Sequence, residues 1–256
     1  MSELITVDQS RAGIAVLTLN RPEKRNALSI DMLEQLCARV ESLAAERANR
    51  VLILTGAGPV FSAGLDLLEE SNPDLVQRSA SCVARALQLL RSTRLITIAA
   101  AHGGAFAGGA GLMAACDIAI GTSDLKIGFP EARRGLLPAL VCATMSPKVR
   151  EGDLRDLFLV GDIIDAVRAQ QIGLLQRVVE PHRLSEQAIA VATSILEGGP
   201  QTIEATKLLL NQAYQPDKSV LPEQMLDVHL GARRSPEASE GLAAFLEKRL
   251  PHWRTH

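Results

Sequence analysis

The stretch ITIAAAHGGAFAGGAGLMAACDIAIG, residues 96–121, decides the fold. Its first six residues, 96–101, are apolar and partly β-branched, which predicts a strand covered on both faces. The glycine-rich run that follows predicts a turn, residues 109–115 a short helix, and residues 117–121 a further strand. A strand, a tight turn, a helix and another strand in succession are typical of α/β proteins.

The same alternation precedes this stretch. Strands are expected at residues 14–19 and 51–55, because both runs are apolar and end at Asn, Gly or Pro signals. Helices are expected at residues 29–47 and 74–91, the first of them capped by Ser29. The order strand, helix, strand, helix, strand predicts an α/β architecture with substantially parallel pairing.

The last third of the chain changes character, with amphipathic segments separated by Pro and Gly. Helices are expected there at residues 184–196, 202–214, 223–230 and 237–249. We therefore expect a core domain at residues 1–195 followed by a helical C-terminal region at residues 196–256.

Composition excludes several classes of function. A net charge of -2 provides no broad basic surface for nucleic acid. No apolar run reaches the roughly 18 residues needed to cross a bilayer, so we expect no membrane insertion and a cytoplasmic location. The four cysteines are far apart and form no C-x-x-C pair, which predicts reduced, buried thiols. They are Cys37, Cys82, Cys116 and Cys142.

Two turns between a strand and a helix leave backbone exposed: residues 61–66 and residues 103–109. Such turns lie beyond the carboxyl ends of parallel strands, where ligands bind in α/β folds. One N–H from each turn could hold a single carbonyl oxygen, which is what a thioester needs when its enolate forms. The alternative is that the glycines serve only close packing.

Glu131 is the main titratable candidate, because it lies between Phe129-Pro130 and a largely apolar run. A carboxyl in an apolar pocket has its pKa raised towards neutrality and can then exchange protons at working pH. A solvated loop carboxylate is the alternative interpretation. The neighbouring Arg133 and Arg134 are expected on a solvated face.

Other candidates are weaker. Residues 109–114 match G-x-G-x-x-A, but the acidic residue that a dinucleotide site needs at the end of a second strand is missing. His102 closes an apolar strand and is expected to be structural, and Ser62 lacks the glycine two positions before it that a nucleophile elbow requires. No metal-ligand spacing is present in the sequence.

Taken together, these motifs resemble the crotonase superfamily, the enoyl-CoA hydratase/isomerase family, over nearly the whole chain. The motifs that carry the resemblance are Asn20-Arg21-Pro22, Asn26-Ala27-Leu28, VLILTGAGPVFSAGLDL, AHGGAFAGGAGLMAACDIAI, IGFPEARRGLLP and SPEASEGLAAFLEKR. The resemblance implies a spiral of β-β-α units with a helical C-terminal trimerisation region. It also implies a homotrimer or a dimer of trimers.

The resemblance also implies roles for particular residues. Ala63 and Gly108 match the two backbone N–H positions of the family's oxyanion hole, and Glu131 matches its second catalytic glutamate. Positions that match the CoA site are Lys24, Arg25, Ala27, Leu65, Asp66 and the C-terminal Lys248. The family needs no metal or organic cofactor, since CoA arrives as part of the acyl-CoA substrate.

The sequence departs from classical hydratases at Gly111, where those enzymes carry a first catalytic glutamate. Three functions therefore stay open: hydration of a 2-enoyl-CoA, Δ3,Δ2-enoyl-CoA isomerisation by Glu131 alone, and acyl-CoA binding without catalysis. The chain looks most like the bacterial branch associated with methylglutaconyl-CoA hydration. It differs from that branch at residues 142–148, where the active-site wall is expected.

Overall fold

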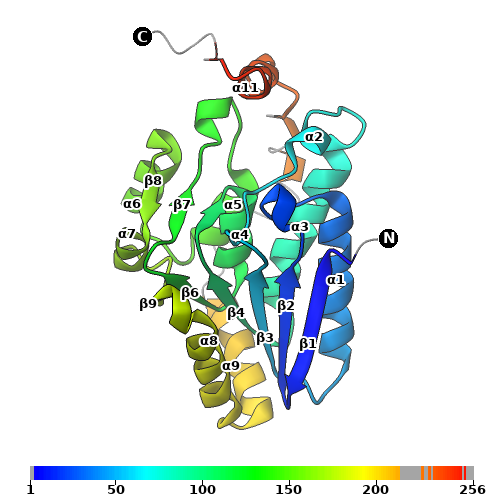
Figure 1. Ribbon diagram of the computed structural model, residues 1–256, viewed down its shortest axis with the longest axis vertical. Helices are drawn as coiled ribbons and strands as arrows, with labels where there is room; N and C mark the ends of the chain where they lie inside the picture. The colour runs from blue at the N-terminus through cyan, green and yellow to red at the C-terminus, as the bar shows by residue number, and fades with distance from the viewer. Residues whose placement is uncertain (1–2, 214–225, 228–229, 232, 250, 252–256) are drawn as a thin grey trace.

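The computed structural model describes residues 3–213, 226–227, 230–231, 233–249 and 251 (Figure 1). Within this part of the chain the strands form a six-stranded sheet and a separate three-stranded sheet. The strands of the larger sheet, in spatial order, are β1 (Ile5–Arg11), β2 (Ile14–Leu19), β3 (Val51–Gly56), β4 (Ile96–Ala101), β6 (Ile118–Thr122) and β9 (Arg177–Val179). Those of the smaller sheet are β5 (Gly104–Phe106), β7 (Lys126–Gly128) and β8 (Ile163–Asp165).

The larger sheet is parallel from β2 to β9, and its edge strand β1 pairs antiparallel with β2. The predicted α/β architecture with substantially parallel pairing is therefore confirmed. Strand β1 was not predicted, because only the first residues of its stretch, ITVDQSR, are apolar and the rest of the strand is exposed.

The predicted helices that fall within the described residues lie close to their expected positions, whereas the short helices at residues 67–70, 139–145, 151–155 and 166–171 were not predicted. Ser29 caps α1 by accepting a hydrogen bond from the N–H of Met32, and α8 has the predicted bounds. The α-helices are α1 (Ile30–Ala45), α2 (Leu67–Glu70), α3 (Val76–Ser92), α4 (Gly108–Ala115), α5 (Ala139–Met145), α6 (Glu151–Arg155), α7 (Ala166–Gln171), α8 (Leu184–Leu196), α9 (Pro200–Ala213) and α11 (Pro236–Leu246). Shorter helical turns are η1 (Pro22–Lys24), η2 (Ala132–Arg134), η3 (Asp156–Val160) and η4 (Pro181–Arg183).

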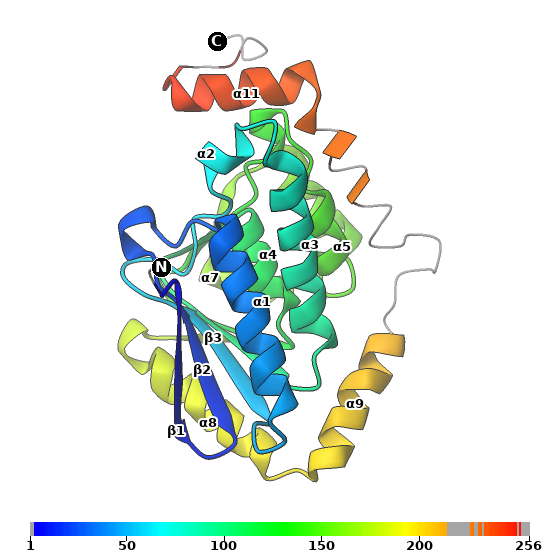
Figure 2. The ribbon, with the colours of Figure 1, turned by 90° about the vertical axis from the view of Figure 1, so that its right-hand side faces the viewer.

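Both faces of the larger sheet are covered, which explains the continuous apolar runs of its inner strands. In β4, Ile98 and Ala100 face α8, whereas Ala99 and Ala101 face the core shared with α1, α3 and α4. Figure 2 shows α1 and α3 on one side of the sheet and α8 on the other. The fully buried β4 therefore holds the glycine-rich turn that follows it in a fixed position.

The helices after residue 195 lie at two ends of the molecule. Helix α9 lies near the base of the sheet, and α11 lies at the opposite end (Figures 1 and 2). The helix predicted at residues 223–230 falls largely outside the described residues. None of the described helices is both long and apolar enough to cross a membrane.

The cysteines follow the prediction in part. Cys37 and Cys116 are buried free thiols, but Cys82 and Cys142 are only half-buried. Burial raises the pKa of Cys37 to about 11 and that of Cys116 to about 12, so both remain protonated near neutral pH.

Candidate active site

The two glycine-containing turns lie side by side above the larger sheet. The segment around Ser62 pairs with β5, where the N–H of Ser62 donates to Gly104 O and the N–H of Phe106 donates to Ser62 O. Two residues on, the segment pairs with the loop before α1: the N–H of Leu28 donates to Gly64 O at 2.7 Å. The first turn is thus held on both sides by backbone hydrogen bonds.

These bonds decide which backbone N–H groups remain able to donate a hydrogen bond to a ligand. The N–H of Ala63 donates to Arg25 O at 2.9 Å, so this group is already engaged. The structure therefore does not support Ala63 as a donor to an oxyanion. In the bridge between Leu28 and Leu65, the N–H of Leu28 donates to Gly64 O and the N–H of Asp66 donates to Leu28 O, so the N–H of Leu65 points away from Leu28. It has no acceptor among the described residues.

Gly108 provides a second N–H, as the first residue of α4. The first N–H groups of a helix have no partner within the helix, and no described residue accepts from Gly108. Ala107, the N-cap, has φ 47° and ψ −122°, a conformation that L-residues rarely adopt. A Cβ added at Gly108 would lie 3.2 Å from Leu65 Cδ2, so the two segments are in contact.

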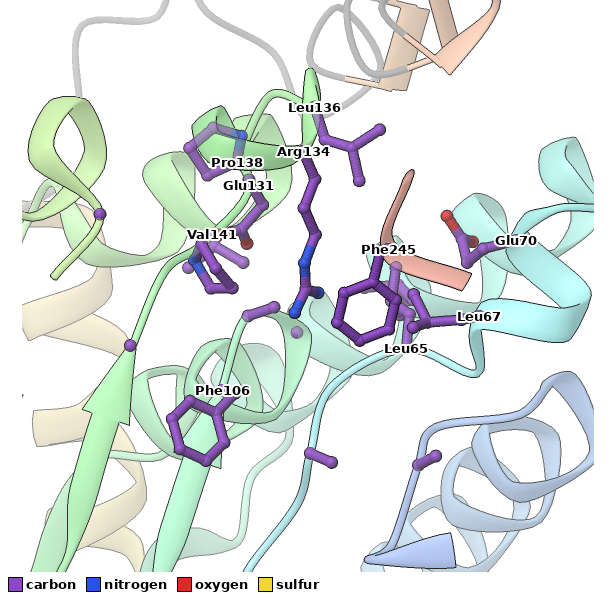
Figure 3. Close-up of a pocket in the computed structure, with 18 of the residues that line it drawn as sticks. Leu65, Leu67, Glu70, Phe106, Glu131, Arg134, Leu136, Pro138, Val141 and Phe245 are labelled. Atoms are coloured by element: carbon purple, nitrogen blue, oxygen red, sulfur yellow. The ribbon is translucent and has the colours of Figure 1, made fainter. Parts of the chain in front are cut away.

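A cavity of about 660 Å³ opens beside these two turns (Figure 3). Its lining comes from segments spread between residues 23 and 245 and includes most of the predicted site residues. The lining includes Glu131, Ala63, Gly108, Lys24, Arg25, Ala27 and Leu65 from the predicted set, together with Leu67, Glu70, Phe106, Arg134, Leu136, Leu137, Pro138, Leu140, Val141 and Phe245.

Two predicted residues lie elsewhere. Asp66 does not line the cavity: it forms an ion pair with Arg21 at 2.6 Å and caps α2 by accepting from the N–H of Leu68. Its role in this structure is to hold the first turn. Lys248 is exposed just after α11, with φ 55°, and is also outside the cavity lining.

Glu131 lies in the wall of the cavity at the start of η2. It is 8% exposed, and its Oε2 atom has no hydrogen-bond partner in the described part of the chain. Burial raises the pKa of Glu131 from 4.5 to about 7, opposed only in part by a backbone hydrogen bond and the charge of Arg134. Near neutral pH this carboxyl exists in both protonation states.

The predicted solvated position of Arg134 is wrong. Arg133 is exposed as expected, but Arg134 is half-buried and lines the cavity. Its guanidinium carbon lies 4.2 Å from the ring centroid of Phe245 in α11. No local signal distinguishes the two arginines, because the ring that covers Arg134 comes from a helix more than a hundred residues later.

Gly111 lies on the buried helix α4. A Cβ added there would lie 3.0 Å from Val141 Cγ2 and 3.4 Å from Leu87 Cδ2. Val141 in α5 therefore occupies the space into which a longer side chain at position 111 would extend. Glu70, another buried carboxyl of the lining, is paired with Arg233 at 3.0 Å and accepts from Ser79.

The remaining candidates have structural roles. An Nε2 atom of His102 lies 2.9 Å from Gly58 O, and Ser62 Oγ donates to Asn26 O. The described residues contain no cluster of three or more potential metal ligands. Sequence reasoning gave no role of its own to the fully buried Asn26, whose amide donates to Ala57 O and Val60 O and so ties the loops around the site together.

Comparison with known proteins identifies the family. The model of the enoyl-CoA hydratase/isomerase family matches residues 9–256. A candidate enoyl-CoA hydratase from Thermus thermophilus is 32% identical over 260 residues, covering 96% of this chain and all of the relative, 100%. The 2,3-dehydroadipyl-CoA hydratase of Escherichia coli is 31% identical, with 99% of each chain covered.

Solved structures agree with the sequence comparison. The crystal structure of an enoyl-CoA hydratase from Mycobacterium avium matches with a TM-score of 0.88 at 33% identity, covering 99% of this chain and 100% of the other. The expected crotonase fold is confirmed. With its family model, its relatives and its fold in agreement, this chain belongs to the enoyl-CoA hydratase/isomerase family.

Proposed function

We propose that this protein adds water across the Cα–Cβ bond of a 2-enoyl-CoA thioester. The observation that carries the proposal is the buried Glu131 carboxyl, whose Oε2 atom has no hydrogen-bond partner among the described residues, in the wall of a cavity that Leu65 and Gly108 also line. A proton-transfer group beside two backbone donors suits a reaction that passes through an enolate.

The oxyanion hole in this proposal consists of the N–H groups of Leu65 and Gly108. Both lack an acceptor among the described residues, whereas the N–H of Ala63 is bonded to Arg25 O. The N-terminal end of α4 adds a positive dipole near the thioester oxygen. In other enzymes, loss of one such donor costs roughly 2.7–4 kcal/mol of transition-state stabilisation.

A single carboxyl can complete the hydration. Glu131 as carboxylate takes a proton from water while the water oxygen bonds to Cβ, and the Cα–Cβ π electrons move to form the enolate. The resulting carboxylic acid then returns the proton to Cα, and the thioester carbonyl re-forms. A pKa of about 7 suits both steps, because neither protonation state is strongly disfavoured.

The CoA moiety is proposed to bind at the mouth of the cavity, where Lys24 and Arg25 are exposed and positively charged. Ala27 lies beside them in the lining. No metal or organic cofactor has a step in this mechanism. A role for Lys248 in holding a phosphate of CoA stays a prediction.

Δ3,Δ2-enoyl-CoA isomerisation is the second candidate, and the surroundings of Gly111 favour it. Val141 closes the space where a second carboxyl would extend, and an isomerase needs only one carboxyl to move a proton between Cα and Cγ. Incubation with a 2-enoyl-CoA and, separately, with a 3-enoyl-CoA distinguishes the two. Hydration without migration of the double bond supports the hydratase, and migration without hydration supports the isomerase.

Turnover of neither ester, with the acyl-CoA still bound, would instead support a binding protein.

The relatives named above do not assign this chain to methylglutaconyl-CoA hydration, so that branch also stays a prediction.

We further propose that the chain assembles as a homotrimer or a dimer of trimers in the cytoplasm. Leu208, Leu209 and Leu210 on α9 are each at least half exposed, and such a row of leucines favours burial against another chain. Light scattering of the purified protein gives the molar mass directly, and a monomer mass at working concentration would contradict the proposal.

A further inference from the structure

Arg134 extends its guanidinium into the catalytic cavity. Figure 3 shows its side chain running between Glu131 and Val141 on one side and Phe245 on the other. The phenyl ring covers one face of the guanidinium at 4.2 Å. Stacking of this kind fixes the plane of the guanidinium and leaves its N–H edge directed at whatever occupies the cavity.

This guanidinium has no hydrogen-bond acceptor and no ion-pair partner within the described part of the chain. Its neighbour Arg133 differs, since that side chain pairs with Asp162 and donates to Val160 O at 3.0 Å. Arg134 is half-buried, and burial lowers its pKa. A desolvated cation without a partner is costly, and a ligand anion would offset that cost.

The rest of the inner wall explains why the anion has to come from the ligand. It is mainly apolar around Arg134, with Leu136, Val141 and Phe245 nearby. Glu70 is already neutralised by Arg233 at 3.0 Å. Glu131 also lines the cavity, and its charge acts on Arg134 only while the carboxyl is ionised. Whenever Glu131 is protonated, the inner cavity therefore keeps one uncompensated positive charge.

We propose that Arg134 selects acyl-CoA substrates that carry a second carboxylate on the acyl chain, remote from the thioester. This inference rests on the proposed function and deepens it by naming the substrate class. Guanidinium is suited to this role, because its planar N–H groups match a carboxylate in a bidentate arrangement. The apolar wall then contacts the methylene groups between the two ends.

The same contact couples substrate choice to proton transfer. The charge of Arg134 lowers the pKa of Glu131, opposing the larger effect of burial. A carboxylate bound to Arg134 cancels part of that charge, so the pKa of Glu131 rises in the complex. The pH profile of kcat therefore lies at higher pH for a carboxylated substrate than for its neutral counterpart.

The experiment compares matched substrate pairs. Five-carbon and six-carbon 2-enoyl-CoA esters are prepared in two forms that differ only at the far carbon, which is a methyl group or a carboxylate. Wild type, Arg134→Met, Arg134→Lys and the control Arg133→Met are assayed for kcat/KM. Binding of the saturated acyl-CoA analogues is measured by calorimetry, which reports selectivity independently of turnover.

We expect wild type to prefer the carboxylated ester of at least one length. Arg134→Met should lose on the order of 10- to 100-fold in kcat/KM for that ester and little for the neutral one. Arg134→Lys should keep part of the preference because it keeps the charge, and Arg133→Met should keep all of it. Circular dichroism checks that each variant is folded.

Two results would overturn the inference. One is an equal kcat/KM of wild type for the carboxylated and the neutral ester at both lengths. The other is an Arg134→Met variant whose kcat/KM falls by the same factor for both esters, as expected if Arg134 binds CoA itself. Hydration of neutral esters would survive either result. If neither form is turned over, the proposed function fails, and the calorimetric preference for the carboxylated analogue alone decides the role of Arg134.

Discussion

Among single residues, Glu131 depends most on its surroundings for its chemistry. The local sequence predicted an apolar setting and a pKa raised towards neutrality, and burial in the structure does raise the pKa, to about 7. The structure adds the cavity and the unbonded Oε2 atom, which the sequence could not indicate. The donor that we propose for the oxyanion, the N–H of Leu65, lies two positions after the predicted one, that of Ala63. An N–H can bind a ligand only if no protein atom already accepts from it. The acceptor of the Ala63 N–H is Arg25 O, which lies on a different segment of the chain, so the local sequence could not reveal it.

The raised pKa of Glu131 makes stability depend on pH. The folded protein binds this proton more tightly than the unfolded chain, so the contribution of Glu131 to the free energy of unfolding falls as pH rises from 4.5 through about 7. Glu131→Gln has no such titration. Between about pH 5 and pH 8, we expect the free energy of unfolding of the variant to rise relative to that of wild type by up to about 3 kcal/mol.

Urea unfolding at several pH values measures this difference. A constant gap between the two proteins across the range would show that the carboxyl titrates normally and is not desolvated. Because Glu131→Gln preserves size, a change in packing alone would also produce a constant gap.

At the scale of elements, α4 connects the glycine-rich turn to the core. All eight of its residues are buried, between α3 and α5. The sequence predicted this helix to within one residue, and it predicted α1, α3 and α8 from their apolar spacing. It could not predict the three-residue strands β5, β7 and β8, because a short strand is defined by its partners and carries no period of its own.

Packing around α4 predicts the effect of restoring a carboxyl at position 111. Gly111→Glu should destabilise the protein by about 3 kcal/mol or more, since its Cβ meets Val141 and its carboxyl has no partner there. Val141→Ala opens the same space. We expect the double variant to lose less free energy of unfolding than the sum of the two single losses, by on the order of 1 kcal/mol.

Denaturant unfolding of the four proteins of this cycle gives the coupling energy. Strict additivity would mean that the side chain at position 111 does not meet Val141 and that the departure from classical hydratases has another cause.

At the scale of the whole molecule, α9 is joined to the sheet by a buried cation. Lys207 is 5% exposed, donates to Leu95 O at 2.7 Å and pairs with Asp117 at 2.8 Å. This contact could not be predicted from the sequence, which indicated a helical region after residue 195 but not where its helices pack. In the structure α9 and α11 lie at opposite ends, because each packs on a different part of the core.

Removal of that cation should weaken the whole fold. Lys207→Met is expected to cost about 2–4 kcal/mol of unfolding free energy, since two buried acceptors and a carboxylate lose their partner. Arg47→Met is the matched control, because Arg47 also joins the core to α9, through Glu204, but its side chain is 80% exposed. That change should cost less than about 0.5 kcal/mol. Equal effects in urea unfolding would contradict this account of α9.

The central claim is that the Glu131 carboxyl moves the proton at the acyl-CoA site. The most direct test is kcat for hydration of a 2-enoyl-CoA by wild type and by Glu131→Gln, with the remote, exposed Glu151→Gln as control. We predict that Glu131→Gln loses at least about 100-fold in kcat while Glu151→Gln keeps wild-type activity. A folded Glu131→Gln protein with wild-type kcat would contradict the claim.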